Sequence, residues 1–148
     1  MEYYLSFSWI GFIVFLLPMI PNIFYFVIPT PAGSENKGNT HGILDVIEHG
    51  SQGIFIFLLI FVVRKQTSEV LCAYTIIMAI TLISYYVLWG FFILGKADLI
   101  LLLGLTVLPV VYFIFAEIWL HNYLAIIPTV IFGIAHIIVT YKNSNFKH

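Results

Sequence analysis

The stretch HGILDVIEHGSQGIFIFLLIFVV, residues 41–63, joins a partly polar first half to an uninterrupted apolar second half. From Leu44 to Val63 it has the ~20 residues that a helix needs to cross a bilayer core. Its polar side chains recur at helical spacing, namely at His41, Asp45, Glu48, His49 and Gln52. At about 100° per residue, these positions fall within an arc of about 100° on one face of an α-helix. The stretch therefore predicts a membrane-spanning helix with one polar face.

The composition of the whole chain extends this prediction. Of the 148 residues, 61% are hydrophobic and 9% are charged, whereas soluble domains carry about 25% charged residues. Hydropathy predicts five spans: Trp9–Ile28, Leu44–Val63, Val70–Leu94, Leu99–Leu120 and Tyr123–Tyr141. We therefore expect one all-α domain over residues 1–148, a bundle of five transmembrane helices without β-structure. Because the connections are short, consecutive helices are expected to be antiparallel neighbours.

The polar face of the second span predicts a functional site. Ionisable groups inside a membrane are costly, so they face the bundle interior or a water-filled cavity. Glu48, His49 and Gln52 lie ~6–12 Å below the expected interface at ~1.5 Å per residue. Beside them, Gly50 and Gly53 would allow a neighbouring helix to approach closely. His41 and Asp45, nearer the interface, fit a structural role in the first turn, where the helix dipole favours a carboxylate.

Polar and aromatic residues of other spans fall at the same end of the expected bundle: Asn22, Tyr85, Tyr86, Trp89 and His136. Antiparallel connectivity places His136 ~7–8 Å deep, which matches the expected depth of His49. A carboxylate and two imidazoles at one depth are less costly together than apart. We therefore predict one site that contains Glu48, His49 and His136, with Tyr85, Tyr86 and Trp89 as its walls.

Two prolines interrupt the first span. Pro18 and Pro21 each remove a backbone donor, which frees the carbonyl one turn earlier and predicts a kinked helix. The amide of Asn22 could satisfy one freed carbonyl, or it could contribute to the polar pocket.

Charged residues at the opposite end predict a structural ion pair, and the distribution of basic residues between the two sides predicts the orientation of the chain in the membrane. Glu117 is expected to pair with Arg64 or to cap the bundle, and a second functional site is the alternative. Lysines on the side of the long loop outnumber the basic residues on the other side: Lys37, Lys96, Lys142 and Lys147 against Arg64 and Lys65. The positive-inside rule then favours an outside N-terminus and an inside C-terminus, in a multi-pass protein of the plasma membrane.

Three functional hypotheses follow from the predicted site. The first is binding or translocation of a small molecule, ion or proton by a pocket of Asn22, Asp45, Glu48, His49, Gln52, Tyr85, Tyr86, Trp89 and His136. The second is a metal-dependent intramembrane enzyme with a divalent metal on His41, Asp45, His49 and His136 and with Glu48 as base. The third is haem held by His49 and His136.

A non-catalytic partner subunit is the alternative to all three, with its polar face against another membrane protein. The sequence contains no basic cluster for nucleic acid, no Gly-rich phosphate loop and no cysteine pair. We therefore expect the lipid bilayer and a small-molecule ligand as partners and no nucleic acid. The sequence is compatible with oligomerisation.

Overall fold

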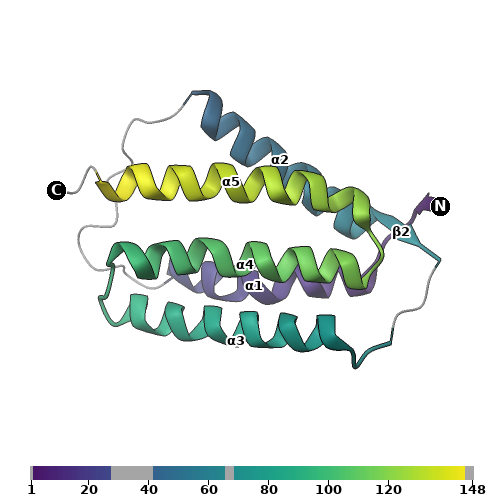
Figure 1. Ribbon diagram of the computed structural model, residues 1–148, viewed down its shortest axis with the longest axis horizontal. Coiled ribbons are helices and arrows are strands. Elements are labelled where there is room, and N and C mark those ends of the chain that lie inside the picture. Colours follow the sequence, from purple (N-terminus) through teal and green to yellow (C-terminus); the bar gives the residue numbers. More distant parts are fainter. Residues whose placement is uncertain (1, 28–41, 66–68, 146–148) are drawn as a thin grey trace.

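The computed structural model describes residues 2–27, 42–65 and 69–145, and it places five helices in one bundle (Figure 1). They are α1 (Trp9–Val27), α2 (Ile43–Phe61), α3 (Ala73–Ile93), α4 (Leu99–Trp119) and α5 (Tyr123–Asn145). The five expected spans are confirmed as helices, with most ends shifted by one to three residues. The helix α5 continues four residues beyond its expected end, from Tyr141 to Asn145.

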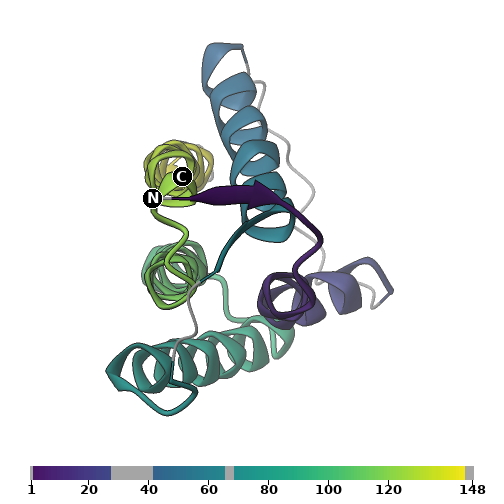
Figure 2. The same ribbon diagram turned by 90° about the vertical axis from the view of Figure 1, so that its right-hand side faces the viewer.

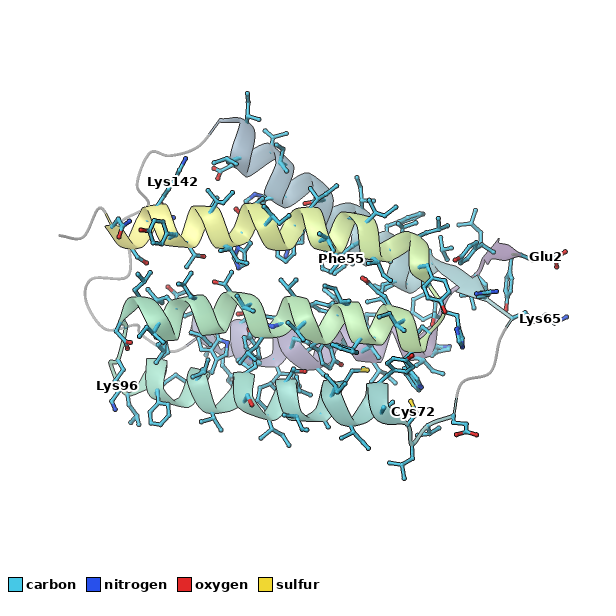
Figure 3. All side chains as sticks on the ribbon, in the orientation of Figure 1. Glu2, Phe55, Lys65, Cys72, Lys96 and Lys142 are labelled. Carbon is cyan, nitrogen blue, oxygen red and sulfur yellow. The ribbon has the colours of Figure 1, made fainter. Side chains whose placement is uncertain are left out.

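The helices have the length and surface of membrane spans. Four of them, α2 to α5, are long and apolar enough to cross a bilayer, and α1 has a shorter apolar stretch, Trp9–Tyr25. Figure 3 shows Lys96 and Lys142 at one end of the bundle and Glu2 and Lys65 at the other. Large apolar side chains are exposed along the flanks between these ends. The chain is therefore a multi-pass membrane protein. We call the end that carries Lys96 and Lys142 the lysine end. We call the other end, which carries Glu2, Lys65 and a pair of antiparallel strands, the hairpin end.

The helices do not all pack in chain order. Viewed from the hairpin end, α3, α4 and α5 form a row, and α1 and α2 lie beside it (Figure 2). The main partner of α2 is α5, and α1 contacts α2, α3 and α4. The expectation that consecutive helices are neighbours is therefore wrong for α2 and α3. Glu48, on the polar face of α2, contacts His136 of α5.

Two short strands form the hairpin end, so the expectation of no β-structure is wrong. Strand β1 (Tyr3–Leu5) pairs with β2 (Val62–Arg64) in antiparallel register, with Tyr3 opposite Arg64. The second expected span thus ends as a helix at Phe61, and its last residues become a strand. The amides of Ser6 and Ser8 continue this contact by donating to carbonyls at the end of α2. The N-terminal segment therefore satisfies backbone carbonyls that α2 leaves free where it ends.

The two prolines of α1 create carbonyls that tyrosines of other helices satisfy. Pro18 cannot donate to the carbonyl of Val14, and Pro21 cannot donate to that of Leu17. The hydroxyl of Tyr112 on α4 donates to Val14 O over 3.0 Å, and that of Tyr86 on α3 donates to Leu17 O over 2.5 Å. These bonds attach the proline segment of α1 to α3 and α4. Figure 2 shows that α1 changes direction along its length, as the prolines predict.

The asparagine that follows has a different role. The expectation that the Asn22 amide satisfies a freed carbonyl is wrong, because its Nδ2 donates to Met19 Sδ at 3.8 Å and its Oδ1 accepts from Tyr85 at 3.5 Å. The Asn22 side chain lines a cavity between the helices.

Close helix contacts occur at other glycines than expected. Gly50 and Gly53 have open space where a Cβ would stand, so the expected close approach beside them is wrong. A Cβ would instead lie 2.2–2.7 Å from an atom of the neighbouring helix at three sites: Gly11 against Leu59, Gly104 against Leu88 and Gly133 against Val110. Since Gly50 and Gly53 are exposed, they lie on the outer surface of α2, away from its contact with α5.

Candidate functional site

A cavity of about 470 Å³ lies between the five helices, in the half of the bundle nearer the lysine end. Its polar lining is formed by Asn22, Glu48, His49, Gln52, Tyr85, Thr106, His136 and Thr140. Its apolar lining is mostly aromatic and includes Phe15, Tyr25, Phe55, Trp89, Phe92, Phe113 and Phe132. Seven of the nine residues predicted for the pocket therefore surround one space, and Asp45 and Tyr86 do not line it.

The strongest polar contact in the cavity joins α2 to α5. His136 Nδ1 lies 2.5 Å from Glu48 Oε1. The Glu48 side chain is 11% exposed and that of His136 is 35% exposed, so the carboxylate is the more deeply buried partner. The imidazole of His136 also stacks on Phe132, with centroids 5.1 Å apart. The phenyl ring limits the orientations of the imidazole, and Nε2 has no hydrogen bond to any of the described residues.

The other predicted residues of α2 have different environments. His49 lines the cavity but is exposed, and its Nδ1 lies 2.9 Å from the backbone carbonyl of Asp45. Gln52, one turn beyond Glu48, also lines the cavity. Glu48, His49 and His136 were predicted to share one site because His49 and His136 were expected at equal depth; all three line the cavity, and the direct contact to His136 is made by Glu48. Adjacent positions on a helix differ by about 100°, so depth alone could not tell which of Glu48 and His49 faces α5.

The opposite wall comes from α1 and α3. Tyr85 is buried, and its hydroxyl donates to Asn22 Oδ1 at 3.5 Å. Trp89, one turn later, is 9% exposed, and its Nε1 has no hydrogen-bond partner among the described residues. A buried indole N–H without a partner is unusual, because such donors are normally satisfied. Tyr86 instead bonds to Leu17 of α1, as described above.

Two threonines complete the polar lining and were not predicted. Thr106 Oγ1 of α4 lies 3.1 Å from Thr140 Oγ1 of α5, and both residues line the cavity. Thr106 is 3% exposed and also donates to the carbonyl of Leu102. Threonine in an apolar helix is common and gives little signal, so helical spacing relative to His136 was the only available clue. The positions 136 and 140 lie one turn apart on α5.

An aromatic cluster closes the cavity toward the hairpin end. Phe55, Phe113 and Phe132 are buried and all line the cavity. The centroid of Phe55 lies 5.1 Å from that of Phe113 and 5.4 Å from that of Phe132. Figure 3 shows Phe55 in the interior, at the level of α4 and α5. These rings form the floor of the cavity.

The residues proposed for a metal or haem are only partly brought together. His41 lies outside the described residues, and within the described ranges no three His, Cys, Asp or Glu side chains form a metal-binding group. His49 and His136 line the same cavity, with Nδ1 of each held by an oxygen. An Nδ1 contact to oxygen is the usual support for a histidine that ligates through Nε2. Metal and haem binding therefore remain predictions.

The predicted ion pair at the hairpin end is wrong. Glu117 is fully buried and its Oε1 contacts Thr129 Oγ1 at 2.5 Å. The guanidinium of Arg64 lies instead over the ring of Tyr123, 5.9 Å from its centroid. Arg64 belongs to β2, and the sheet directs this strand to the bundle end, so the cation stays near water while Glu117 stays inside.

Comparison with protein-family models, curated proteins and solved structures gave no match to this chain. Any assignment of function therefore depends on the geometry of the cavity.

Proposed function

We propose that this membrane protein binds a small, uncharged molecule with an apolar body and a hydrogen-bonding head in the cavity at the lysine end. The contact between Glu48 and His136 inside the cavity carries this proposal. Glu48 and His136 each satisfy one hydrogen-bonding atom of the other, so the site offers positioned hydrogen-bonding groups and not an isolated charged side chain for a ligand to neutralise.

The size and lining of the cavity support the same ligand class. A volume of about 470 Å³ falls within the ~300–1,000 Å³ of small-molecule sites. The aromatic floor would contact the apolar body of the ligand. The unpartnered Trp89 Nε1 would donate to an oxygen of the head, and the amides of Asn22 and Gln52 would complete its hydrogen bonds.

We further propose that the lysine end faces the cytoplasm and that the protein lies in the plasma membrane. The orientation is supported by the sequence, in which four basic residues are expected on that side (Lys37, Lys96, Lys142 and Lys147) against two on the other (Arg64 and Lys65). The cavity would then open to the cytoplasm, and its ligand would be a cytoplasmic or membrane-dissolved molecule.

Mass spectrometry of molecules extracted from the purified protein tests the binding proposal. We expect one small molecule to be retained by the wild type and by the control Glu2→Gln, which alters an exposed acid at the far end. Glu48→Gln should retain at least about tenfold less, because a hydrogen bond to a charged group contributes ~1.5–3 kcal/mol. Equal retention by Glu48→Gln and wild type would contradict the proposal. Bound metal or a haem spectrum would favour the alternatives.

A further inference from the structure

A second buried carboxyl lies outside the cavity, near the hairpin end. Glu117 of α4 has no exposed surface, and among the described residues its Oε2 has no hydrogen-bond partner. The only hydrogen bond of its side chain within that part of the chain goes to Thr129 of α5. A carboxylate buried without a cation is strongly disfavoured, so this group needs a different explanation from the paired Glu48.

The number of hydrogens available for the two contacts of Thr129 indicates how Glu117 is accommodated. Thr129 Oγ1 lies 2.5 Å from Glu117 Oε1 and 2.9 Å from the backbone carbonyl of Ala125. Both of these oxygens accept hydrogen bonds when Glu117 is a carboxylate, but a threonine hydroxyl has one hydrogen. With Glu117 as a carboxylate, the single hydrogen of Thr129 is shared between two acceptors. Both contacts can be full two-centre hydrogen bonds only if Glu117 carries a proton and donates it to Thr129 Oγ1, while Thr129 donates to Ala125 O. The geometry therefore favours a protonated Glu117.

The surroundings of Glu117 separate it from the ligand cavity. Phe113 lies one turn before Glu117 on α4, and Phe132 lies about one turn after Thr129 on α5. Both phenylalanines belong to the floor of the cavity. The pair of Glu117 and Thr129 consequently lies beyond this floor, on the side of the hairpin end.

A smaller cavity lies at the hairpin end, near the end of α4 that carries Glu117. It has a volume of about 270 Å³ and is lined in part by Arg64 and by Trp119, Leu120 and Asn122, which lie two to five residues after Glu117; Glu117 itself does not line it. Asn122 is 2% exposed, and its Oδ1 is also without a partner among the described residues. Its backbone N–H donates to the carbonyl of Glu117. Unsatisfied buried oxygens of this kind commonly bind water.

We propose that Glu117 is a proton-binding site that exchanges its proton with water through the cavity at the hairpin end. The ligand of this site is a proton, and the exchange moves it between the Glu117 carboxyl and a water molecule. The proposal does not depend on ligand binding at Glu48.

Infrared spectroscopy of the full chain in lipid tests the proposal at neutral pH. A protonated carboxyl has a carbonyl stretching band that a carboxylate lacks. We expect the wild type and the control Glu2→Gln to show this band, and we expect Glu117→Gln to lose it. The band should shift after transfer to heavy water, because the proton exchanges. A band that persists in Glu117→Gln, or one that never shifts in heavy water, would overturn the proposal.

Three further variants test the contact and the route. Thr129→Val removes the hydrogen-bond partner of Glu117 and should shift the frequency of the carboxyl band. This variant tests the assignment even if Glu117→Gln fails to fold. An unshifted band would contradict the assignment. Val63→Trp fills the hairpin-end cavity, which Val63 lines, and should slow deuteration of the band. Thr106→Leu alters the other cavity and should not slow it. The opposite result would overturn the proposed route.

Discussion

Removing the hydroxyl of Tyr112 should destabilise the bundle through the carbonyl that Pro18 frees. Tyr112 is 2% exposed, and its hydroxyl donates to Val14 O at 3.0 Å. Tyr112→Phe keeps the ring but leaves this carbonyl without a donor. Single hydrogen bonds between membrane helices contribute about 0.6 kcal/mol on average and at most about 1.7, whereas an unsatisfied buried acceptor costs about 1–3 kcal/mol.

We therefore expect Tyr112→Phe to lower the free energy of unfolding by about 1–2 kcal/mol. Thermal unfolding in detergent should show a Tm lower by about 2–8 °C. The matched control is Tyr141→Phe, because Tyr141 is exposed at the end of α5. This control should change the Tm by less than about 1 °C.

Substitution of Pro18 provides a second test, a double-mutant cycle with Tyr112→Phe. Pro18→Ala restores a backbone N–H that can donate to Val14 O. In that background, Tyr112→Phe should cost less than about 0.5 kcal/mol, which gives a coupling of about 1 kcal/mol in the double-mutant cycle. Additive effects of the two substitutions would refute the link between this proline and this tyrosine.

Four further substitutions test contacts within the bundle. Gly11→Ala should lower the Tm by several degrees because the added Cβ would meet Leu59 O at 2.2 Å, whereas Gly50→Ala should be neutral or slightly stabilising. Asn122→Leu should cost about 1–3 kcal/mol in a denaturation assay, since the amide bonds two carbonyls at the end of α2. Arg64→Ala should cost at most about 1 kcal/mol, because among the described residues Arg64 makes no ion pair with a buried acid and contacts the ring of Tyr123 instead; a loss of 3 kcal/mol or more would contradict this assignment.

Hydropathy was sufficient to predict the five helices, because a membrane requires long continuous apolar runs. The same signal could not predict β1 and β2, which have three residues each and no detectable periodicity. Their pairing joins residues about sixty positions apart, and it depends on where the end of α2 lies in space.

The candidate site was predicted in part. The stripe on α2 and the depth of His136 indicated a shared polar region, and the structure brings Glu48 and His136 into contact there. The rotation of each helix decides the remaining contacts, and an apolar sequence determines rotation weakly. The bonds from Tyr86 and Tyr112 to α1, and the contact of Glu117 with Thr129, all depend on such rotations.

Thiol labelling offers the most direct test of the central claim that one face of α2 lines a water-accessible cavity. Cys72 is the only cysteine in the chain, so Cys72→Ser provides a background without reactive thiols. Gln52→Cys in this background should react with a membrane-impermeant maleimide from the lysine end, because a thiol in water ionises and one in hydrocarbon does not. Ile54→Cys replaces a residue on the outer surface of α2 that is 56% exposed; we expect hydrocarbon to surround this position, so its thiol should stay unlabelled. Labelling of Ile54→Cys with protection of Gln52→Cys would contradict the account.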